Sequence, residues 1–141
     1  RPDNDIDCTL DFYVNEAAQE AKLIEFLDAT VSEGFTPKDI IILSPRRQCA
    51  ASRLSTKPWD QKLAPLEKAG PSQIPYHTIQ GFKGLERPVV ALTDISDVQI
   101  DEARALLYVG LTRGTQKVVA FAEEPVRQQL NDLVSFIPLG Q

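Results

Sequence analysis

Two continuous apolar runs constrain the fold of this chain more than any other feature of its sequence. The runs Asp39-Ile-Ile-Ile-Leu-Ser44 and Val89-Val-Ala-Leu-Thr-Asp94 lack the polar alternation of a strand that has one face in water. Runs of this kind are typical of strands buried on both faces, as in parallel sheets that helices cover on both sides. The sequence therefore predicts an α/β fold.

Strand and helix patterns alternate along the rest of the chain. Three more segments are predicted strands: Thr9–Val14, Ile74–Thr78 and Lys117–Ala122. Predicted helices run from the N-cap Asn15 to the C-cap Gly34, over Arg46–Leu54, over Asp101–Thr112 and over Glu124–Val134. The third of them has Ala105, Tyr108, Val109 and Thr112 on one stripe, with Leu106 and Leu107 beside it. The Pro-rich segment 55–75 is expected to form loops with a short helical turn. This alternation predicts a three-layer α/β domain with a mostly parallel sheet.

Length and composition limit the class of protein. The 141 residues fit one compact domain, and 43% hydrophobic with 25% charged residues is ordinary for a globular chain. No run is long enough to span a bilayer. Cys8, Cys49 and the single histidine, His77, are too few for a disulfide scaffold or a zinc site, so we expect buried thiols in a reducing cytoplasm. Because the chain has no Met and opens Arg-Pro-Asp, we expect it to be excised from a longer protein.

The net charge of −5 conceals a basic middle section. Residues 1–40 hold 3 basic and 10 acidic side chains, residues 41–91 hold 8 and 3, and residues 92–141 hold 4 and 7. A basic middle is consistent with an anionic partner such as nucleic-acid phosphates. A solvated surface whose signs happen to cluster is the alternative. The acidic total argues against a free-standing nucleic-acid-binding domain.

Two segments are candidates for chemistry. The segment Thr78-Ile-Gln-Gly-Phe-Lys-Gly-Leu-Glu86 directly follows a predicted strand, and Leu107-Tyr-Val-Gly-Leu-Thr-Arg-Gly114 is an apolar helix that ends in one arginine. We expect both at the carboxyl ends of the strands, where such sheets bind ligands. Taken singly, each has an ordinary explanation, a tight turn in the first case and an arginine favoured by the helix dipole in the second.

Together the two segments resemble a known pair of motifs. The first resembles motif V of the UvrD/Rep/PcrA helicases, usually T-x-H-x-x-K-G-L-E, and the second resembles their motif VI, typically A-Y-V-G-x-T-R-A. The order and spacing match, and the upstream strand, helix and strand over Thr9–Ser44 are similar as well. The resemblance implies a RecA-like domain of the P-loop NTPase type, namely the second (C-terminal) motor domain of a superfamily-one, ATP-dependent DNA helicase spanning residues 1–141.

The resemblance implies roles at the nucleotide. Arg113 matches the motif VI arginine that reaches the γ-phosphate as a finger, where a fixed guanidinium stabilises the transferring phosphoryl group. Glu86 matches the glutamate that accepts a hydrogen bond from the ribose. Gly84 allows the backbone to approach the ligand closely.

The resemblance also implies contacts to single-stranded DNA, with RNA as an alternative. Thr78 and Gln80 match positions that face the strand, although the family usually has His where this chain has Gln80. Arg46 and Arg47 follow the second strand, where relatives have a DNA-contacting loop, but they match no motif residue. Gln can donate to phosphate but cannot stack as His does.

The sequence lacks the parts that would hold a nucleotide by itself. It contains no G-x-x-x-x-G-K-[ST] phosphate loop and no acidic strand of the Walker B type. ATP and Mg²⁺ are therefore expected to bind mainly to a first RecA-like motor domain of the same protein, and this chain is expected to have no metal ligands and no activity alone. The resemblance further implies a role in DNA repair, and the composition favours the cytoplasm with no membrane contact.

Two alternatives remain open. A non-catalytic RecA-like module could keep both motifs as a scaffold for a protein or nucleic-acid partner. The other alternative is a flavodoxin-like regulator that binds no nucleotide, and the presence of both motifs argues against it.

Overall fold

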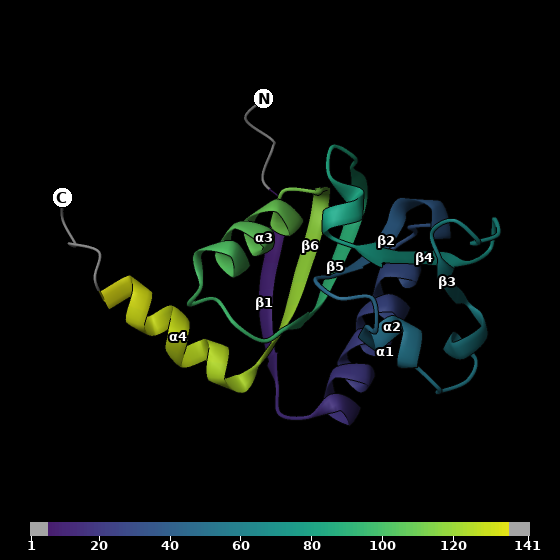
Figure 1. The fold of residues 1–141 in the computed structure, drawn as a ribbon. Helices are drawn as coiled ribbons and strands as arrows, with labels where there is room; N and C mark the ends of the chain where they lie inside the picture. The colour runs from purple at the N-terminus through teal and green to yellow at the C-terminus, as the bar shows by residue number, and fades with distance from the viewer. Residues whose placement is uncertain (1–5, 136–141) are drawn as a thin grey trace.

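The computed structural model describes residues 6–135 as a six-stranded parallel sheet with helices on both faces (Figure 1). The strand order is β1-β6-β5-β2-β4-β3, and every pair is parallel. The elements are β1 (Asp7–Tyr13), α1 (Glu16–Ser32), η1 (Pro37–Asp39), β2 (Ile40–Ser44), α2 (Ala50–Arg53), η2 (Trp59–Gln61), β3 (Leu63–Pro65), β4 (Ile74–Thr78), η3 (Gln80–Phe82), β5 (Arg87–Ile95), α3 (Asp101–Leu111), β6 (Gly114–Glu123) and α4 (Glu124–Ser135). The predicted parallel α/β architecture is confirmed.

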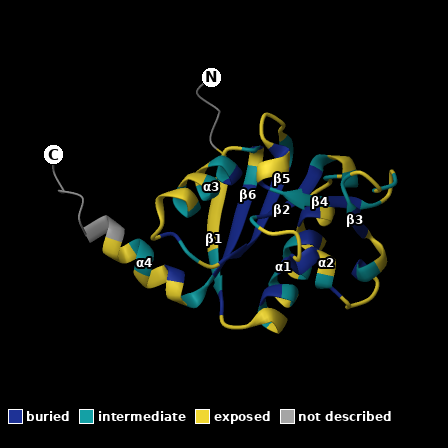
Figure 2. Ribbon diagram, viewed as in Figure 1, coloured by how far each residue is buried: buried dark blue, intermediate teal, exposed yellow. Residues whose placement is uncertain are grey.

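The central strands are buried on both faces, as the apolar runs predict. All five residues of β2 are buried, and β5 is buried from Val89 to Ile95. Figure 2 shows the middle of the sheet as buried and the edge strand β1 as largely exposed. Successive side chains of β2 point to opposite faces of the sheet and therefore pack into two different hydrophobic cores. Ile40 and Ile42 pack with α1 and α2, whereas Ile41 and Leu43 pack with η3 and α3.

The helices cover the two faces unequally. Leu23 and Leu27 of α1 are completely buried against one face, and the half-buried Phe26 meets Phe121 of β6 edge-on, with ring centroids 6.3 Å apart. The Asn15 side chain accepts the Ala18 N–H at 2.8 Å and so begins α1 as predicted. On the opposite face α3 and η3 cover β2, β5 and β6.

The predicted helix over Arg46–Leu54 is mostly absent. Only Ala50–Arg53 is helical, because Cys49 and Ser52 form a capping pair that starts the helix late, and Leu54 is extended and buried in the core. Strand β3 was not predicted either. Its three residues include Pro65, which is tolerated because β3 lies at the edge of the sheet. The expected helical turn in the Pro-rich segment is η2.

The predicted stripe of α3 is only partly correct. Val109 packs against the core, as do Leu106 and Leu107 beside it. Tyr108 is 69% exposed, and Ala105 and Thr112 are exposed as well. Gly110 sets this orientation: a Cβ there would lie 2.8 Å from Leu92 Cδ2, so the helix approaches β5 most closely at the residue without a side chain. Of the two cysteines, Cys49 is buried as expected but Cys8 is exposed on the edge strand.

Two classes of feature were not found among residues 6–135. No helix in this range is long and apolar enough to cross a membrane. The same residues contain no group of three or more His, Cys, Asp or Glu side chains placed to hold a metal ion.

Candidate functional site

The two edges of the sheet carry different groups of the predicted site residues. β6 begins directly after Arg113, and the Arg87 N–H at the start of β5 donates to the Arg113 carbonyl at 3.0 Å. Arg113 therefore lies at the amino ends of the strands, whereas Thr78 lies at the carboxyl end of β4. The expectation that both motif segments share the carboxyl edge is wrong, because a helix between parallel strands must return to the opposite edge. The nine residues of β5 separate the edges by about 25 Å.

A pocket of about 530 Å³ lies at the carboxyl ends of β2 and β4, and we call it the carboxyl-edge pocket. Three of the four predicted nucleic-acid residues, Arg46, Arg47 and Thr78, line it together. The remaining lining residues are Gln48, Cys49, Ser52, Pro65, Glu67, Tyr76 and His77. Both arginines are exposed, and the two aromatic rings are half-buried. The pocket therefore combines positive charge with ring surface, which are the two components of single-strand binding sites.

The turn after β4 is held by the side chains of its own polar residues. The Thr78 hydroxyl accepts the Gly81 N–H at 3.1 Å, and the His77 Nδ1 accepts the Thr78 N–H at 2.7 Å. His77 thus acts as a local hydrogen-bond acceptor. Gln80 does not line the pocket, but its amide donates to the Pro45 carbonyl at 3.3 Å and so ties this turn to the loop that carries the arginines.

The predicted nucleotide-contacting residues lie together at the amino ends of β5 and β6, which we call the amino-edge surface. The half-buried Arg113 side chain folds onto the end of α3, where its Nε donates to the Val109 carbonyl at 3.2 Å and its Nη2 to the Thr112 hydroxyl at 3.0 Å. Its Nη1 also reaches the Leu85 carbonyl at 3.4 Å. The Val109 carbonyl also accepts from the Thr112 N–H and hydroxyl, so the guanidinium adds one more donor to an end of the helix that is already hydrogen-bonded.

Glu86 and Gly84 lie beside Arg113 in the loop between η3 and β5. Both are exposed, and Gly84 has a φ of +83°, a conformation that favours glycine. A Cβ at Gly84 would meet no atom within 4 Å, so the backbone is open to solvent there. An exposed carboxylate, an open backbone and an arginine thus share one small surface.

Asp94, at the carboxyl end of β5, accepts more side-chain hydrogen bonds than the predicted site residues, and no motif in the sequence marks it. Asp94 is only 1% exposed and has a φ of +63°, which is uncommon for a residue with a side chain. Its Oδ2 accepts the Thr93 hydroxyl at 2.6 Å, the Ser44 hydroxyl at 3.0 Å and the Ala50 N–H at 3.0 Å. One carboxylate oxygen therefore joins β5, β2 and the start of α2.

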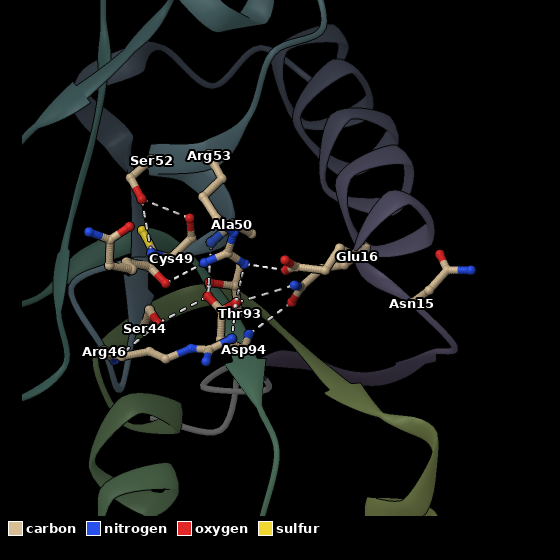
Figure 3. Close-up of polar contacts among 12 residues, drawn as sticks. Asn15, Glu16, Ser44, Arg46, Cys49, Ala50, Ser52, Arg53, Thr93 and Asp94 are labelled. Atoms are coloured by element: carbon tan, nitrogen blue, oxygen red, sulfur yellow. Dashed lines mark hydrogen bonds and ion pairs between the residues drawn. The ribbon is translucent and has the colours of Figure 1, made fainter.

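The other oxygen of Asp94 receives charged and amide donors (Figure 3). Arg53 donates to Oδ1 at 3.2 Å, Arg46 at 3.4 Å and the buried Gln19 amide at 3.3 Å. Gln19 also accepts the Asp94 N–H at 2.8 Å, so α1 is tied to the same point. Arg53 in addition forms an ion pair with Glu16. The only hint of this network in the sequence is an acidic residue that closes an apolar strand.

The hydrogen bonds determine the charge state of Asp94. Burial disfavours the charged form and is the strongest single influence, but donation from two hydroxyls, a backbone N–H and the Arg53 guanidinium outweighs it. The pKa of the Asp94 carboxyl is therefore held below its ordinary value. Asp94 is a charged, fully hydrogen-bonded group at neutral pH.

This shift predicts a specific loss of stability in acid. A folded-state pKa below the unfolded-state pKa adds stability above the ordinary carboxyl pKa, and that stability disappears as the pH falls through the folded-state pKa. We expect the urea midpoint of Asp94→Asn to fall less than that of the wild type below about pH 4. Glu67→Gln, which removes an exposed carboxylate, serves as the control. Identical acid limbs for wild type and Asp94→Asn would contradict the prediction.

Comparisons with known proteins match this fold and both motif segments. Residues 76–120 match the family model described as the UvrD-like helicase C-terminal domain. Among solved structures, the chain resembles the C-terminal domain of a possible DNA helicase from Lactobacillus plantarum WCFS1, with a TM-score of 0.62 and 16% identity over 84% of this chain and 73% of that chain. A comparison with curated proteins gave no match. The resemblance of the motif segments to UvrD-like helicases is confirmed, and the structural likeness confirms the fold.

Proposed function

We propose that this chain is the second motor domain of an ATP-dependent DNA helicase and that it uses its two sheet edges for two ligands. Single-stranded nucleic acid binds over the carboxyl-edge pocket, and ATP held by a first motor domain contacts the amino-edge surface. The observation that carries the proposal is the grouping of residues. Arg46, Arg47 and Thr78 meet in one pocket, whereas Arg113 and Glu86 lie together at the opposite edge.

The carboxyl-edge pocket fits a nucleotide strand better than a small neutral ligand. Arg46 and Arg47 supply charge for phosphates, and the rings of Tyr76 and His77 offer faces for a base. The Thr78 hydroxyl accepts one N–H and lies 3.4 Å from His77 Nδ1, a long contact that its proton can exchange for a phosphate oxygen.

The amino-edge surface fits one side of a nucleotide and does not surround one. Bound ATP would supply the phosphoryl group that is transferred to water. Arg113 would leave its helix end to neutralise charge on that group, and the exposed Glu86 carboxylate would accept from the ribose. The backbone at Gly84 leaves room for this approach. We expect the chain alone to show no ATPase activity above background in a coupled assay, with or without oligonucleotide. Robust turnover would contradict this division of labour.

A non-catalytic module is the second candidate function, and one observation favours it. Each of the three nitrogens of the Arg113 guanidinium donates one hydrogen bond to the end of its own helix or to the Leu85 carbonyl. An arginine that only caps a helix would look the same.

Charge reversal of Arg46 and Arg47 to Glu tests the nucleic-acid surface. We expect the chain to bind a labelled dT oligonucleotide weakly at low salt, and the double variant to lose at least tenfold in affinity, because each phosphate contact releases counterions. Fluorescence anisotropy at several salt concentrations measures both affinity and its salt dependence. The matched control reverses Lys38 and Lys68, two exposed lysines that do not line the pocket. Equal losses in both double variants would show that only overall charge matters.

A further inference from the structure

We propose that Asp94 is a positioning residue for nucleic-acid binding, because its buried carboxylate holds Arg46 in place at the rim of the carboxyl-edge pocket. The inference rests on the proposed function and assigns a role to a residue that lies outside both motifs. Asp94 itself contacts no ligand, since it is only 1% exposed.

Asp94 holds Arg46 at two points. The guanidinium Nη2 pairs with Oδ1 at 3.4 Å. The Arg46 backbone N–H donates to the Ser44 hydroxyl oxygen at 3.2 Å, and that hydroxyl in turn donates to Asp94 Oδ2. Asp94 therefore holds the side chain of Arg46 directly and its backbone through the Ser44 hydroxyl.

The Arg46 guanidinium remains available to a ligand while it is held. Its side chain is 55% exposed, and the planar group has five N–H donors, of which the contact with Asp94 uses one. Arg53, which also pairs with Glu16, supplies a second and less exposed cation to Asp94. Arg46 is therefore not the sole counterion of the buried carboxylate, and it can share its charge with a phosphate.

The backbone of Asp94 supports a role beyond packing. A φ of +63° is an uncommon backbone conformation for a residue other than glycine, although aspartate adopts it more often than most. Such conformations persist where several surrounding contacts hold the residue in place, often at functional sites. At Asp94 these contacts are hydrogen bonds from α1, β2 and α2. The loop that carries Arg46 and Arg47 connects two of these elements, β2 and α2. Arg47 is the natural comparison, since its side chain makes no ion pair within residues 6–135.

Positioning and simple electrostatics predict opposite effects for Asp94→Asn. Removing a negative charge near a polyanion by itself strengthens binding, whereas releasing Arg46 weakens it because a mobile guanidinium loses more freedom on contact. We expect Asp94→Asn to weaken binding of a labelled dT oligonucleotide about three- to tenfold at low salt and to reduce the slope of log K against log salt by about 0.7. Glu67→Gln, which removes a carboxylate that lines the pocket, is expected to bind more tightly.

Two further measurements make the test independent of folding defects and of the proposed function. In an Arg46→Gln background, Asp94→Asn is expected to cause no further loss of affinity, because only the electrostatic gain from the removed charge is left. In the free chain, Asp94→Asn is expected to speed phenylglyoxal modification of Arg46 several-fold, followed by mass spectrometry, and to leave modification of Arg47 unchanged.

Three results would overturn the inference: binding by Asp94→Asn as tight as that of Glu67→Gln, an equal loss in the Arg46→Gln background, or unchanged modification of Arg46. A wild-type chain that binds no oligonucleotide would instead contradict the proposed function, and with it the binding role of Asp94. The modification rates would then still show whether Asp94 restrains Arg46, so the two failures are distinguishable.

Discussion

Replacing Arg113 with alanine is expected to lower kcat for ATP hydrolysis by about 10³ or more when the chain is joined to a first motor domain that carries a phosphate loop. The reason is that a guanidinium aimed at the transferring phosphoryl group helps most where charge develops in the transition state. Arg113→Lys is expected to restore little activity, because an ammonium keeps the charge and loses the planar fork. Steady-state ATPase kinetics on both variants measure the effect.

The matched control is Arg104→Ala on the same helix. Arg104 also donates to backbone carbonyls, those of Val98 and Gln99, but at the opposite end of α3. Both variants lose side-chain hydrogen bonds to backbone carbonyls at or next to an end of α3, so thermal melts should show similar small losses of stability. Only Arg113→Ala is expected to lose kcat. If Arg113→Ala kept most of its kcat, the arginine would be a helix cap only, and the non-catalytic module would be the better description.

A Glu86→Ala variant in the same joined protein distinguishes binding from catalysis. Hydrogen bonding to a ribose changes little between ground and transition states, so the loss is expected mainly in KM. The exposed position of Glu86 makes a folding defect an improbable cause. A large fall in kcat with unchanged KM would contradict the ribose assignment.

Asp94→Leu is expected to lower the free energy of unfolding of the chain by about 3–5 kcal/mol. Leucine would leave buried hydroxyls, the Ala50 N–H and two guanidiniums without their shared acceptor, and each such loss is unfavourable in a water-poor interior. A leucine at a φ of +63° adds backbone strain. Urea unfolding followed by circular dichroism measures the change.

Two companion variants divide this loss into its causes. Asp94→Asn keeps the shape and one acceptor oxygen and tolerates the left-handed backbone, so it should cost less than half as much as Asp94→Leu. Asp94→Gly removes the strain but also the acceptor, and should fall between the two. A Leu variant as stable as the wild type would show that the network contributes no stability.

The fold class was predictable from sequence because it depends on local patterns. The runs Ile40–Leu43 and Val89–Leu92 are apolar on both faces, and a sheet covered on both sides buries them. The motif segments were recognisable for a related reason. Gly84, Glu86 and Arg113 stand at the positions that the family motifs give them, and such positions are visible in the sequence alone. The start of α1 at Asn15 likewise depends on one local hydrogen bond.

Tertiary structure alone decided which residues share a site. Nothing local places Arg113 and Thr78 at opposite edges, because this follows from the return of α3 across the sheet. The Asp94 side chain is hydrogen-bonded to Gln19, 75 residues away in sequence, and to Ser44, 50 residues away. No pattern in a single sequence predicts contacts between such distant residues. The helix expected after β2 is short for the same reason, since Arg46 and Ala50 bond to Asp94 and the loop follows that buried carboxylate. Local sequence patterns determine where the helices and strands of this protein form. Hydrogen bonds between buried polar groups that are distant in sequence determine the conformation of its loops.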